Sequence, residues 1–308
     1  MSPRTIRIAT RGSPLAIAQT ESVHSALVAL HPDRSFEIRV ISTQGDRMKD
    51  RPLPEIGGKG LFTADLEEAL RTGDVDMAIH SVKDLPVDLP SGLRLGPLPD
   101  RVDPRDVLIS REGKALDGLP RGSRIGTSSP RRRAQVLRWR RDLDVVPLRG
   151  NIETRIRKVR EGKCDATILA YAGLIRLGLE SEIAEVLEPD RFLPPAGQGA
   201  IGVEIREGDE EVLEILSEIG DASAWNEVEA ETACLRALGG GCRTPIGASA
   251  RADEGALTLV AGVWSVDGDV EFRAEVQGPV ARATLLGERA ADALREQGAE
   301  KILTGGEG

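Results

Sequence analysis

Segments with strand-like alternation and segments with helical periodicity follow one another along the first part of the chain. Residues 6–10 alternate like a short strand, and the apolar residues of 15–30 recur at helical spacing. Ser13 is a good helix N-cap, and Pro14 suits the first helical position. Further along, the pattern predicts a strand, a helix and a buried strand over residues 36–42, 61–71 and 75–82. Such alternation is typical of an α/β lobe with a largely parallel sheet.

The same arrangement then returns. Residues 123–130 lead through serine and proline into a helix, as residues 10–14 do. Residues 159–168 repeat the helix end, glycine, aspartate and buried strand of residues 70–79. The repeat predicts two similar α/β lobes that face each other across a cleft. In such sheets ligands bind beyond the carboxyl ends of the strands, beside helix N-termini.

The pattern changes after Arg191. Residues 194–199 are typical of an ordered turn or hinge, and residues 200–205 of a strand that returns to a sheet. The remainder predicts an α+β unit with a helix, two strands and a closing helix over residues 227–238, 258–266, 270–276 and 283–297. The predicted domains are lobe 1 from residues 1–99 and 200–217, lobe 2 from residues 100–199, and an α+β C-terminal domain from residues 218–308.

Composition narrows the class of protein. Of 308 residues, 40% are hydrophobic, which is enough for two or three cores. The net charge of −9 argues against general affinity for nucleic acid, and the aromatic content of 3% argues against a base-stacking surface. No segment is typical of a secretion signal or a bilayer span. Three cysteines and three histidines are too scattered for a disulfide framework or a metal site. We therefore expect a cytoplasmic, metal-independent protein.

Arginines gather in one region of this acidic chain. Arg131, Arg132 and Arg133 open a predicted helix, and Arg149, Arg155 and Arg176 follow. Cations in the first turn of a helix oppose the macrodipole, at roughly 0.3–1 kcal/mol each. The alternatives are a solvated helix face and an anion bound at the helix start. The unfavourable placement of the three arginines favours a site for a polyanion.

Other polar residues lie at the predicted strand ends and strand-to-helix turns, where such a sheet places its ligand. They are Arg11, Ser13, Ser81, Lys83, Asp84, Thr127, Ser128, Ser129 and Asn151. His80 lies within a buried strand pattern, which favours a structural role over proton transfer. Cys242 follows three glycines, so it is either a small buried thiol in a tight turn or a sulfur that projects from a loop.

Seven strings, in order along nearly the whole chain, resemble the porphobilinogen deaminase family, also called hydroxymethylbilane synthases. The strings are Arg11-Gly12-Ser13-Pro14-Leu15-Ala16, Gly57-Gly58-Lys59-Gly60-Leu61-Phe62, His80-Ser81-Val82-Lys83-Asp84-Leu85-Pro86, Gly126-Thr127-Ser128-Ser129-Pro130-Arg131-Arg132, Leu148-Arg149-Gly150-Asn151, Leu193-Pro194-Pro195-Ala196-Gly197-Gln198-Gly199 and Gly240-Gly241-Cys242. The resemblance implies two lobes similar to periplasmic binding proteins, joined by hinges, and a small C-terminal domain.

The resemblance also implies an activity. Members of this family condense four porphobilinogen molecules head to tail into hydroxymethylbilane, with release of ammonia at each step, in tetrapyrrole biosynthesis. The product would grow on a dipyrromethane cofactor joined by a thioether to Cys242. Asp84, next to Lys83, would stabilise the cation left by loss of ammonia. The resemblance further implies a monomer whose product passes to uroporphyrinogen-III synthase, with no nucleic acid, membrane or metal involved.

The residues expected to bind cofactor and substrate follow from the same resemblance, because each pyrrole carries two carboxylates that arginine can pair in a bidentate manner. They are Arg11, Ser13, Phe62, Ser81, Thr127, Ser128, Ser129, Arg131, Arg132, Arg149, Asn151, Arg155, Arg176 and Gln198.

Three positions depart from the usual pattern of the family. Glu55 stands where a basic residue is common, Gly239 where an acidic one is common, and Arg133 where a neutral one is common. Two other classes of function fit the sequence less well. A non-catalytic binding protein of the same bilobed fold would leave Cys242 and the third domain without a role. A nucleic-acid-binding protein conflicts with the acidic composition.

Overall fold

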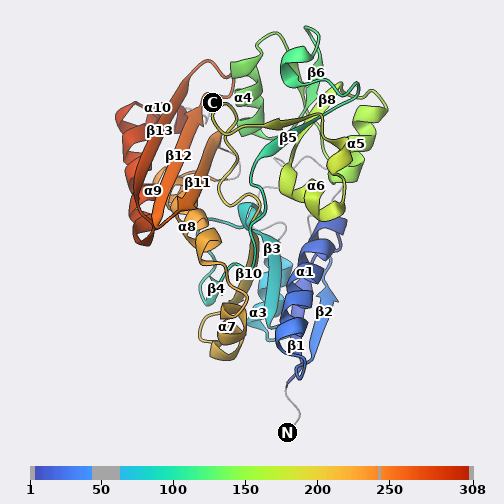
Figure 1. The fold of residues 1–308 in the computed structure, drawn as a ribbon, viewed down its shortest axis with the longest axis vertical. Helices are drawn as coiled ribbons and strands as arrows, with labels where there is room; N and C mark the ends of the chain where they lie inside the picture. The colour runs from blue at the N-terminus through green and yellow to red at the C-terminus, as the bar shows by residue number, and fades with distance from the viewer. Residues whose placement is uncertain (1–3, 44–62, 242–243, 305–308) are drawn as a thin grey trace. The chain divides into compact units, whose positions relative to one another are not determined.

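The structure is a computed structural model that describes residues 4–43, 63–241 and 244–304 (Figure 1). It divides into two compact units. Unit 1 comprises Met1–Arg101 and Ala200–Trp225, and unit 2 comprises Val102–Gly199 and Asn226–Gly308. Unit 2 therefore holds both the second predicted lobe and most of the predicted C-terminal domain. The domain boundaries drawn from the sequence stay predictions.

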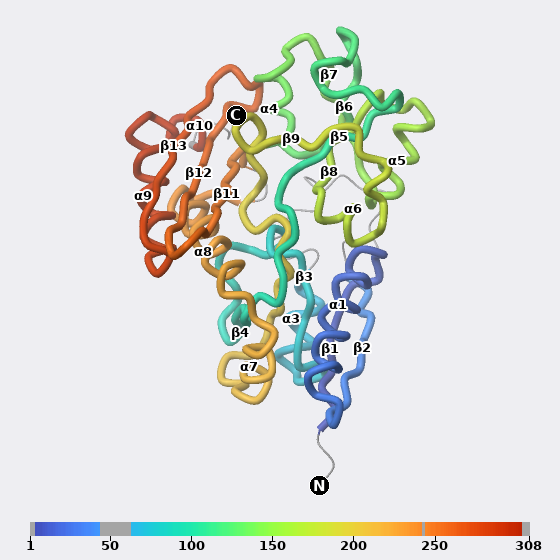
Figure 2. Tube along the Cα trace, in the orientation of Figure 1, coloured from blue at the N-terminus to red at the C-terminus, as the bar shows by residue number. Residues whose placement is uncertain are grey.

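Unit 1 is built on a five-stranded sheet with the strand order β2-β1-β3-β10-β4. β1 pairs in parallel with β2 and β3, whereas β10 is antiparallel to both β3 and β4, so one strand is reversed. Figure 1 shows β10 beside β3, and Figure 2 traces the same chain as a tube. The strands are β1 (Ile6–Thr10), β2 (Phe36–Val40), β3 (Met77–Ser81), β4 (Leu93–Leu95) and β10 (Ile201–Arg206).

Helices cover both faces of this sheet. Val23 and Leu27 of α1 pack with Ile8, Ile79 and other alternate strand residues on one face, together with residues of α7. Leu66 of α3 packs with the intervening strand residues on the other face. The elements are α1 (Pro14–Leu30), α3 (Ala64–Arg71), the 3-10 turn η2 (Val82–Asp84) and α7 (Glu210–Ser217).

The first sheet of unit 2 repeats this topology. Its order is β7-β6-β8-β5-β9, with β6 parallel to β7 and β8, and β5 antiparallel to β8 and β9. The elements are β5 (Asp106–Ser110), η3 (Leu116–Gly118), β6 (Arg124–Gly126), α4 (Pro130–Trp139), β7 (Asp144–Val146), α5 (Ile152–Arg160), β8 (Ala166–Ala170), α6 (Tyr171–Leu177), η4 (Glu180–Glu182) and β9 (Glu185–Leu187). The predicted internal repeat is therefore confirmed, whereas the reversed fourth strand in each sheet departs from the largely parallel sheet that the sequence predicted.

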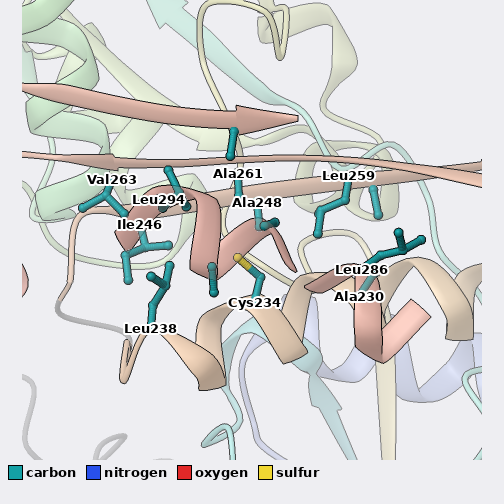
Figure 3. Close-up of a cluster of buried hydrophobic side chains, with 14 of the residues drawn as sticks. Ala230, Cys234, Leu238, Ile246, Ala248, Leu259, Ala261, Val263, Leu286 and Leu294 are labelled. Atoms are coloured by element: carbon teal, nitrogen blue, oxygen red, sulfur yellow. The ribbon is translucent and has the colours of Figure 1, made fainter. Parts of the chain in front are cut away.

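A separate antiparallel sheet of order β11-β12-β13 forms the C-terminal part of unit 2. Figure 3 shows its core, in which Cys234 of α8 and Leu238, just after this helix, pack with Leu286 and Leu294 of α9 and with the strands. The elements are α8 (Ala222–Ala237), β11 (Ile246–Asp253), β12 (Ala256–Trp264), β13 (Glu271–Pro279), η5 (Val280–Arg282), α9 (Ala283–Glu296) and α10 (Glu300–Thr304). The predicted fold class, two α/β sheets and a small α+β domain, is confirmed.

Candidate active site

The predicted catalytic residues of unit 1 follow strand β3 directly. Ser81 is the last residue of β3, and Lys83 and Asp84 lie in the 3-10 turn η2. The main-chain N–H of Val82 donates to the carbonyl of Ala200 at 3.1 Å, which ties this turn to the chain that enters β10. Lys83 is half-buried and Asp84 is exposed. A carboxylate is thus presented to solvent at the carboxyl end of a buried strand.

The β1–α1 turn carries Arg11 and Ser13. Ser13 caps α1, as predicted, and its hydroxyl accepts a hydrogen bond from the Ala16 N–H at 3.3 Å. In the second turn of α1, the buried side chain of Gln19 is hydrogen-bonded to the Ser81 hydroxyl. Gln19 therefore joins the helix that Ser13 caps to the strand end that carries Ser81. The sequence prediction omitted Gln19, although a glutamine among the apolar positions of 15–30 was a usable signal.

His80 lies inside unit 1 and does not face the solvent. Its Nε2 is 3.1 Å from Glu204 Oε2 on β10, and the two side chains are 4% and 0% exposed. The contact has the distance of an ion pair but not the alignment of a hydrogen bond. This burial agrees with the structural role expected from the sequence.

In unit 2, Arg131 and Arg132 are buried rather than exposed at the start of α4. Both donate to the carboxylate of Asp106 at 2.7 Å, Arg131 through Nη2 to Oδ2 and Arg132 through Nη2 to Oδ1. Gln198 Nε2 donates to the same carboxylate at 3.0 Å. The anion that the structure shows beside these arginines is Asp106, a side chain of the protein itself, and the site for a bound polyanion stays a prediction. Sequence reasoning missed Asp106, the polar residue that opens the apolar run of β5.

Burial and the two arginines have opposite effects on the pKa of Asp106. Asp106 is fully buried, which alone would raise the pKa of its carboxyl. The charges of Arg131 and Arg132 and their hydrogen bonds outweigh that effect, and they hold the pKa of Asp106 far below its usual range. Asp106 is therefore a fixed negative charge at every physiological pH.

The serines and threonine before α4 fix this helix start. Ser129 caps α4, and its hydroxyl accepts from the Arg132 N–H at 3.4 Å. The Ser129 N–H in turn donates to Thr127 Oγ1 at 3.2 Å, and the Ser128 hydroxyl donates to the Leu148 carbonyl at 3.1 Å. Thr127 is buried and Ser128 is exposed. These hydrogen bonds fix the orientation of the first turn of α4.

The segment from Arg149 to Arg155 forms a second helix start in the same sheet. Asn151 caps α5 by accepting from the Thr154 N–H at 2.9 Å, and Arg155 Nε donates to the Gly150 carbonyl at 2.8 Å. Arg149 and Arg155 are half-buried. Gly150 has φ of +120°, and a Cβ there would lie 2.6 Å from the Thr154 side chain. Only glycine fits this turn without strain.

Arg176 contacts the loop that carries Gln198, which the sequence pattern predicts as an ordered turn or hinge. Arg176 Nη2 donates to the Gly199 carbonyl at 2.8 Å. Gly197, in the same loop, donates its N–H to Glu231 of α8 at 2.8 Å, and Glu231 also accepts from the Ala250 N–H at 2.7 Å. Glu231, which the sequence prediction missed, thus joins this loop to the C-terminal sheet.

Two predicted site residues, Phe62 and Cys242, lie outside the described residues. On the two sides of Cys242, Gly241 and Thr244 are joined by hydrogen bonds, among them Thr244 Oγ1 to the Gly241 carbonyl at 2.7 Å. Gly239 has φ of +64°, which explains a glycine where the family pattern commonly has an acidic residue. Arg133, the other described departure, donates to the Val145 carbonyl at 3.0 Å.

The two cysteines that the structure does describe are both buried. Burial raises the pKa of the Cys164 thiol, and it raises the pKa of the Cys234 thiol to about 12. Since the thiolate is the nucleophile, neither is suited to form a thioether. Within the described ranges, no helix combines the length and the apolar character that a membrane span requires.

These features define an α/β protein of two repeated sheets with a third, antiparallel sheet, whose strand ends carry an exposed carboxylate in one unit and arginines in the other. The family model described as "Porphobilinogen deaminase, dipyromethane cofactor binding domain" matches residues 6–214. The model described as "Porphobilinogen deaminase, C-terminal domain" matches residues 225–296. The chain belongs to the porphobilinogen deaminase family.

Similar proteins agree over nearly the whole length. A protein of Syntrophobacter fumaroxidans named porphobilinogen deaminase is 48% identical over 303 residues, which cover 98% of each chain. A protein of the same name from Roseiflexus castenholzii is 46% identical over 301 residues, which cover 98% of this chain and 99% of that protein.

Proposed function

We propose that this chain is an enzyme that condenses four porphobilinogen molecules head to tail into hydroxymethylbilane and releases ammonia at each step. The match of residues 6–214 to the cofactor-binding domain of the family carries this proposal. The family resemblance assigns a covalent dipyrromethane to Cys242, and this cofactor supplies the pyrrole end to which new units are joined.

The residues of the described chain suit such a polycarboxylate. Arg132 is buried, and its Nε donates no hydrogen bond to any described residue. Because buried polar groups in proteins are nearly always hydrogen-bonded, this N–H fits a ligand carboxylate. Arg149 and Arg155 lie at the α5 start, where main-chain N–H groups add to their positive charge. In our proposal these arginines bind the acetate and propionate groups.

Asp84 has a different role in this proposal. Loss of ammonia from porphobilinogen leaves a cationic pyrrole unit, and a carboxylate beside its nitrogen stabilises that charge. Asp84 is exposed at the end of β3, where a substrate can reach it. Gln19 fixes Ser81 three residues before Asp84, so the turn that carries the carboxylate is anchored at its start. Lys83, the neighbour of Asp84, is the second catalytic residue in this proposal.

The oligomeric state, the cellular compartment, the enzyme that takes the product and the domain division are proposed from the family resemblance. We propose that the enzyme works as a monomer in the cytoplasm and that uroporphyrinogen-III synthase takes its product. We also propose the three-domain division at residues 99, 199 and 217, with Cys242 carried by the third domain.

The direct test is the intact mass of the purified full chain, beside Cys242→Ser and, as a matched control, Cys234→Ser. We expect an added mass of two linked pyrrole units on the wild type and on Cys234→Ser, and none on Cys242→Ser. If the wild type is unmodified, porphobilinogen is added. A chain that then gains no pyrrole mass and releases no ammonia would exclude the proposed function.

A further inference from the structure

The Asp106 cluster, which we define as Asp106, Arg131, Arg132 and Gln198, has two positive charges and one negative charge. Asp106 and Gln198 are 0% exposed, Arg131 is 4% exposed and Arg132 is 7% exposed. Charges so far from water interact strongly with one another, because the effective dielectric constant of a protein interior is low. The cluster therefore keeps a net charge of about +1 at the start of α4.

Each guanidinium in the cluster is held at two points. One terminal nitrogen of each arginine donates to Asp106, and the other donates to a main-chain carbonyl, that of Leu193 for Arg131 and that of Ile168 for Arg132. The Ile168 carbonyl is 2.8 Å from Arg132 Nη1. Hydrogen bonds at both terminal nitrogens thereby fix the plane of each guanidinium group.

The cluster nevertheless has an unused donor. Arg132 Nε is buried and makes no hydrogen bond within the described part of the chain. An arginine without Asp106 beside it would attract a carboxylate with its full charge. With Asp106 in place, the two arginines share one internal anion, and the attraction left for a ligand is that of a single positive charge.

We propose that Asp106 is a positioning residue that tunes the carboxylate affinity of Arg131 and Arg132, so that a growing polycarboxylate is held but can still move past them. This inference rests on the proposed function, in which each added unit brings two further carboxylates. Ground-state binding that is too tight lowers turnover, because only interactions that strengthen in the transition state accelerate a reaction. Asp106 limits that binding by neutralising half of the buried positive charge.

The test is a series of variants that differ in the net charge of the Asp106 cluster. Asp106→Asn raises the cluster to +2, Arg132→Gln lowers it to 0, and the double variant Asp106→Asn/Arg132→Gln returns it to +1. Asp103→Asn is the matched control, because Asp103 is an aspartate three residues away that pairs with Arg105 at 2.6 Å and not with the cluster.

The readout is binding and not turnover. Calorimetry measures the Kd of each full-length variant, at several salt concentrations, for a pyrrole that carries acetate and propionate groups but no aminomethyl group. We expect Asp106→Asn to bind about threefold to tenfold more tightly than the wild type at low salt, with a steeper salt dependence. We expect Arg132→Gln to bind more weakly with a shallower salt dependence, and the double variant and Asp103→Asn to have the wild-type slope.

A structural role of Asp106 gives a different result. In that case Asp106→Asn binds more weakly than the wild type, and this finding overturns the proposal. If Asp106→Asn does not fold, the double variant decides, because its cluster has the same net charge as that of the wild type. A double variant with the slope of Arg132→Gln overturns the proposal. A wild type that releases no ammonia from porphobilinogen contradicts the proposed function instead, so the two failures are distinct.

Discussion

The side-chain amide of Gln19 binds the hydroxyl of Ser81 through both of its ends. Gln19 Nε2 donates to Ser81 Oγ at 3.0 Å, and Ser81 Oγ donates to Gln19 Oε1 at 3.2 Å. Gln19 is buried on α1, whereas Ser81 is the last residue of β3. The pair is therefore a polar link between a helix and the strand end that leads to Asp84.

Removing this link should reduce activity without unfolding the enzyme. We expect Gln19→Leu, which nearly preserves the volume, to lower kcat/KM about tenfold, equal to about 1.4 kcal/mol, because Ser81 loses its orienting partner. Steady-state rates of ammonia release measure the effect. Thr20→Val is the control, since Thr20 is also buried but donates within α1, to the Ala16 carbonyl at 2.8 Å. Equal losses in the two variants would show that helix packing alone is responsible.

Asp84 is the residue on which the proposed chemistry depends most. A carboxylate about 4 Å from a cation at an effective dielectric constant of about 20 contributes roughly 4 kcal/mol. If all of this stabilises the transition state, Asp84→Asn lowers kcat up to about a thousandfold. The rate is measured on protein whose cofactor content has been confirmed by mass. Asp88→Asn, an exposed aspartate four residues further on, is expected to stay near the wild-type rate. A fully loaded Asp84→Asn enzyme with near-normal turnover would remove Asp84 from the mechanism.

Local signals in the sequence predicted much of the fold. The strand at residues 6–10 and the helix at residues 14–30 agree with β1 and α1 because alternation, an N-cap serine and a proline define them locally. The helix predicted at residues 227–238 begins earlier in the structure, at Ala222. Strand β11 was not predicted, although it pairs with β12 along its whole length, because its small residues Gly247 and Ala248 carry little periodic signal.

The candidate site was predictable only in part. The sequence located Arg131 and Arg132 at a helix start and inferred an anion beside them. Asp106, which supplies a carboxylate there, lies 25 residues before Arg131 and opens the reversed strand of its sheet. Strand order is decided by tertiary packing, and no local pattern reports it. The same holds for Gln19 and Ser81, which are 62 residues apart.

Gly150 gives a prediction about the arginine segment. Its φ of +120° is unfavourable for any residue with a side chain, and a Cβ would lie 2.6 Å from Thr154 Cγ2. We expect Gly150→Ala to destabilise the fold by about 1–3 kcal/mol and to raise KM for porphobilinogen, because the turn that carries Arg149 must shift. Thermal unfolding and steady-state kinetics test the two effects. Gly178→Ala is the control, since Gly178 also has positive φ but a Cβ there would meet no atom within 4 Å. An unchanged KM in Gly150→Ala would show that the conformation of this turn does not affect the binding of porphobilinogen.

Asp76 gives a prediction about acid stability. It is fully buried before β3 and accepts from the Arg7 N–H at 2.9 Å and from Arg206 Nη2 at 3.1 Å. Burial alone would raise the pKa of Asp76, but the hydrogen bonds from Arg7 and Arg206 outweigh it and hold this pKa below its usual range. A carboxyl with a lowered folded-state pKa stabilises the fold at pH values above the unfolded pKa of about 3.9. That contribution is lost as the pH falls through the lower folded-state value.

Asp76→Asn should therefore be less stable than the wild type at pH 7, by about 3 kcal/mol, because Arg7 and Arg206 lose a buried partner. This difference in stability should shrink as the pH falls below about 4, since protonation of Asp76 then removes the charge that Asn lacks at every pH. Urea unfolding at a series of pH values measures both effects. Asp74→Asn removes an exposed aspartate two residues earlier and is expected to follow the wild-type curve. A stability difference between Asp76→Asn and the wild type that stays constant down to pH 2 would show that the charge of Asp76 contributes nothing and that only its shape matters.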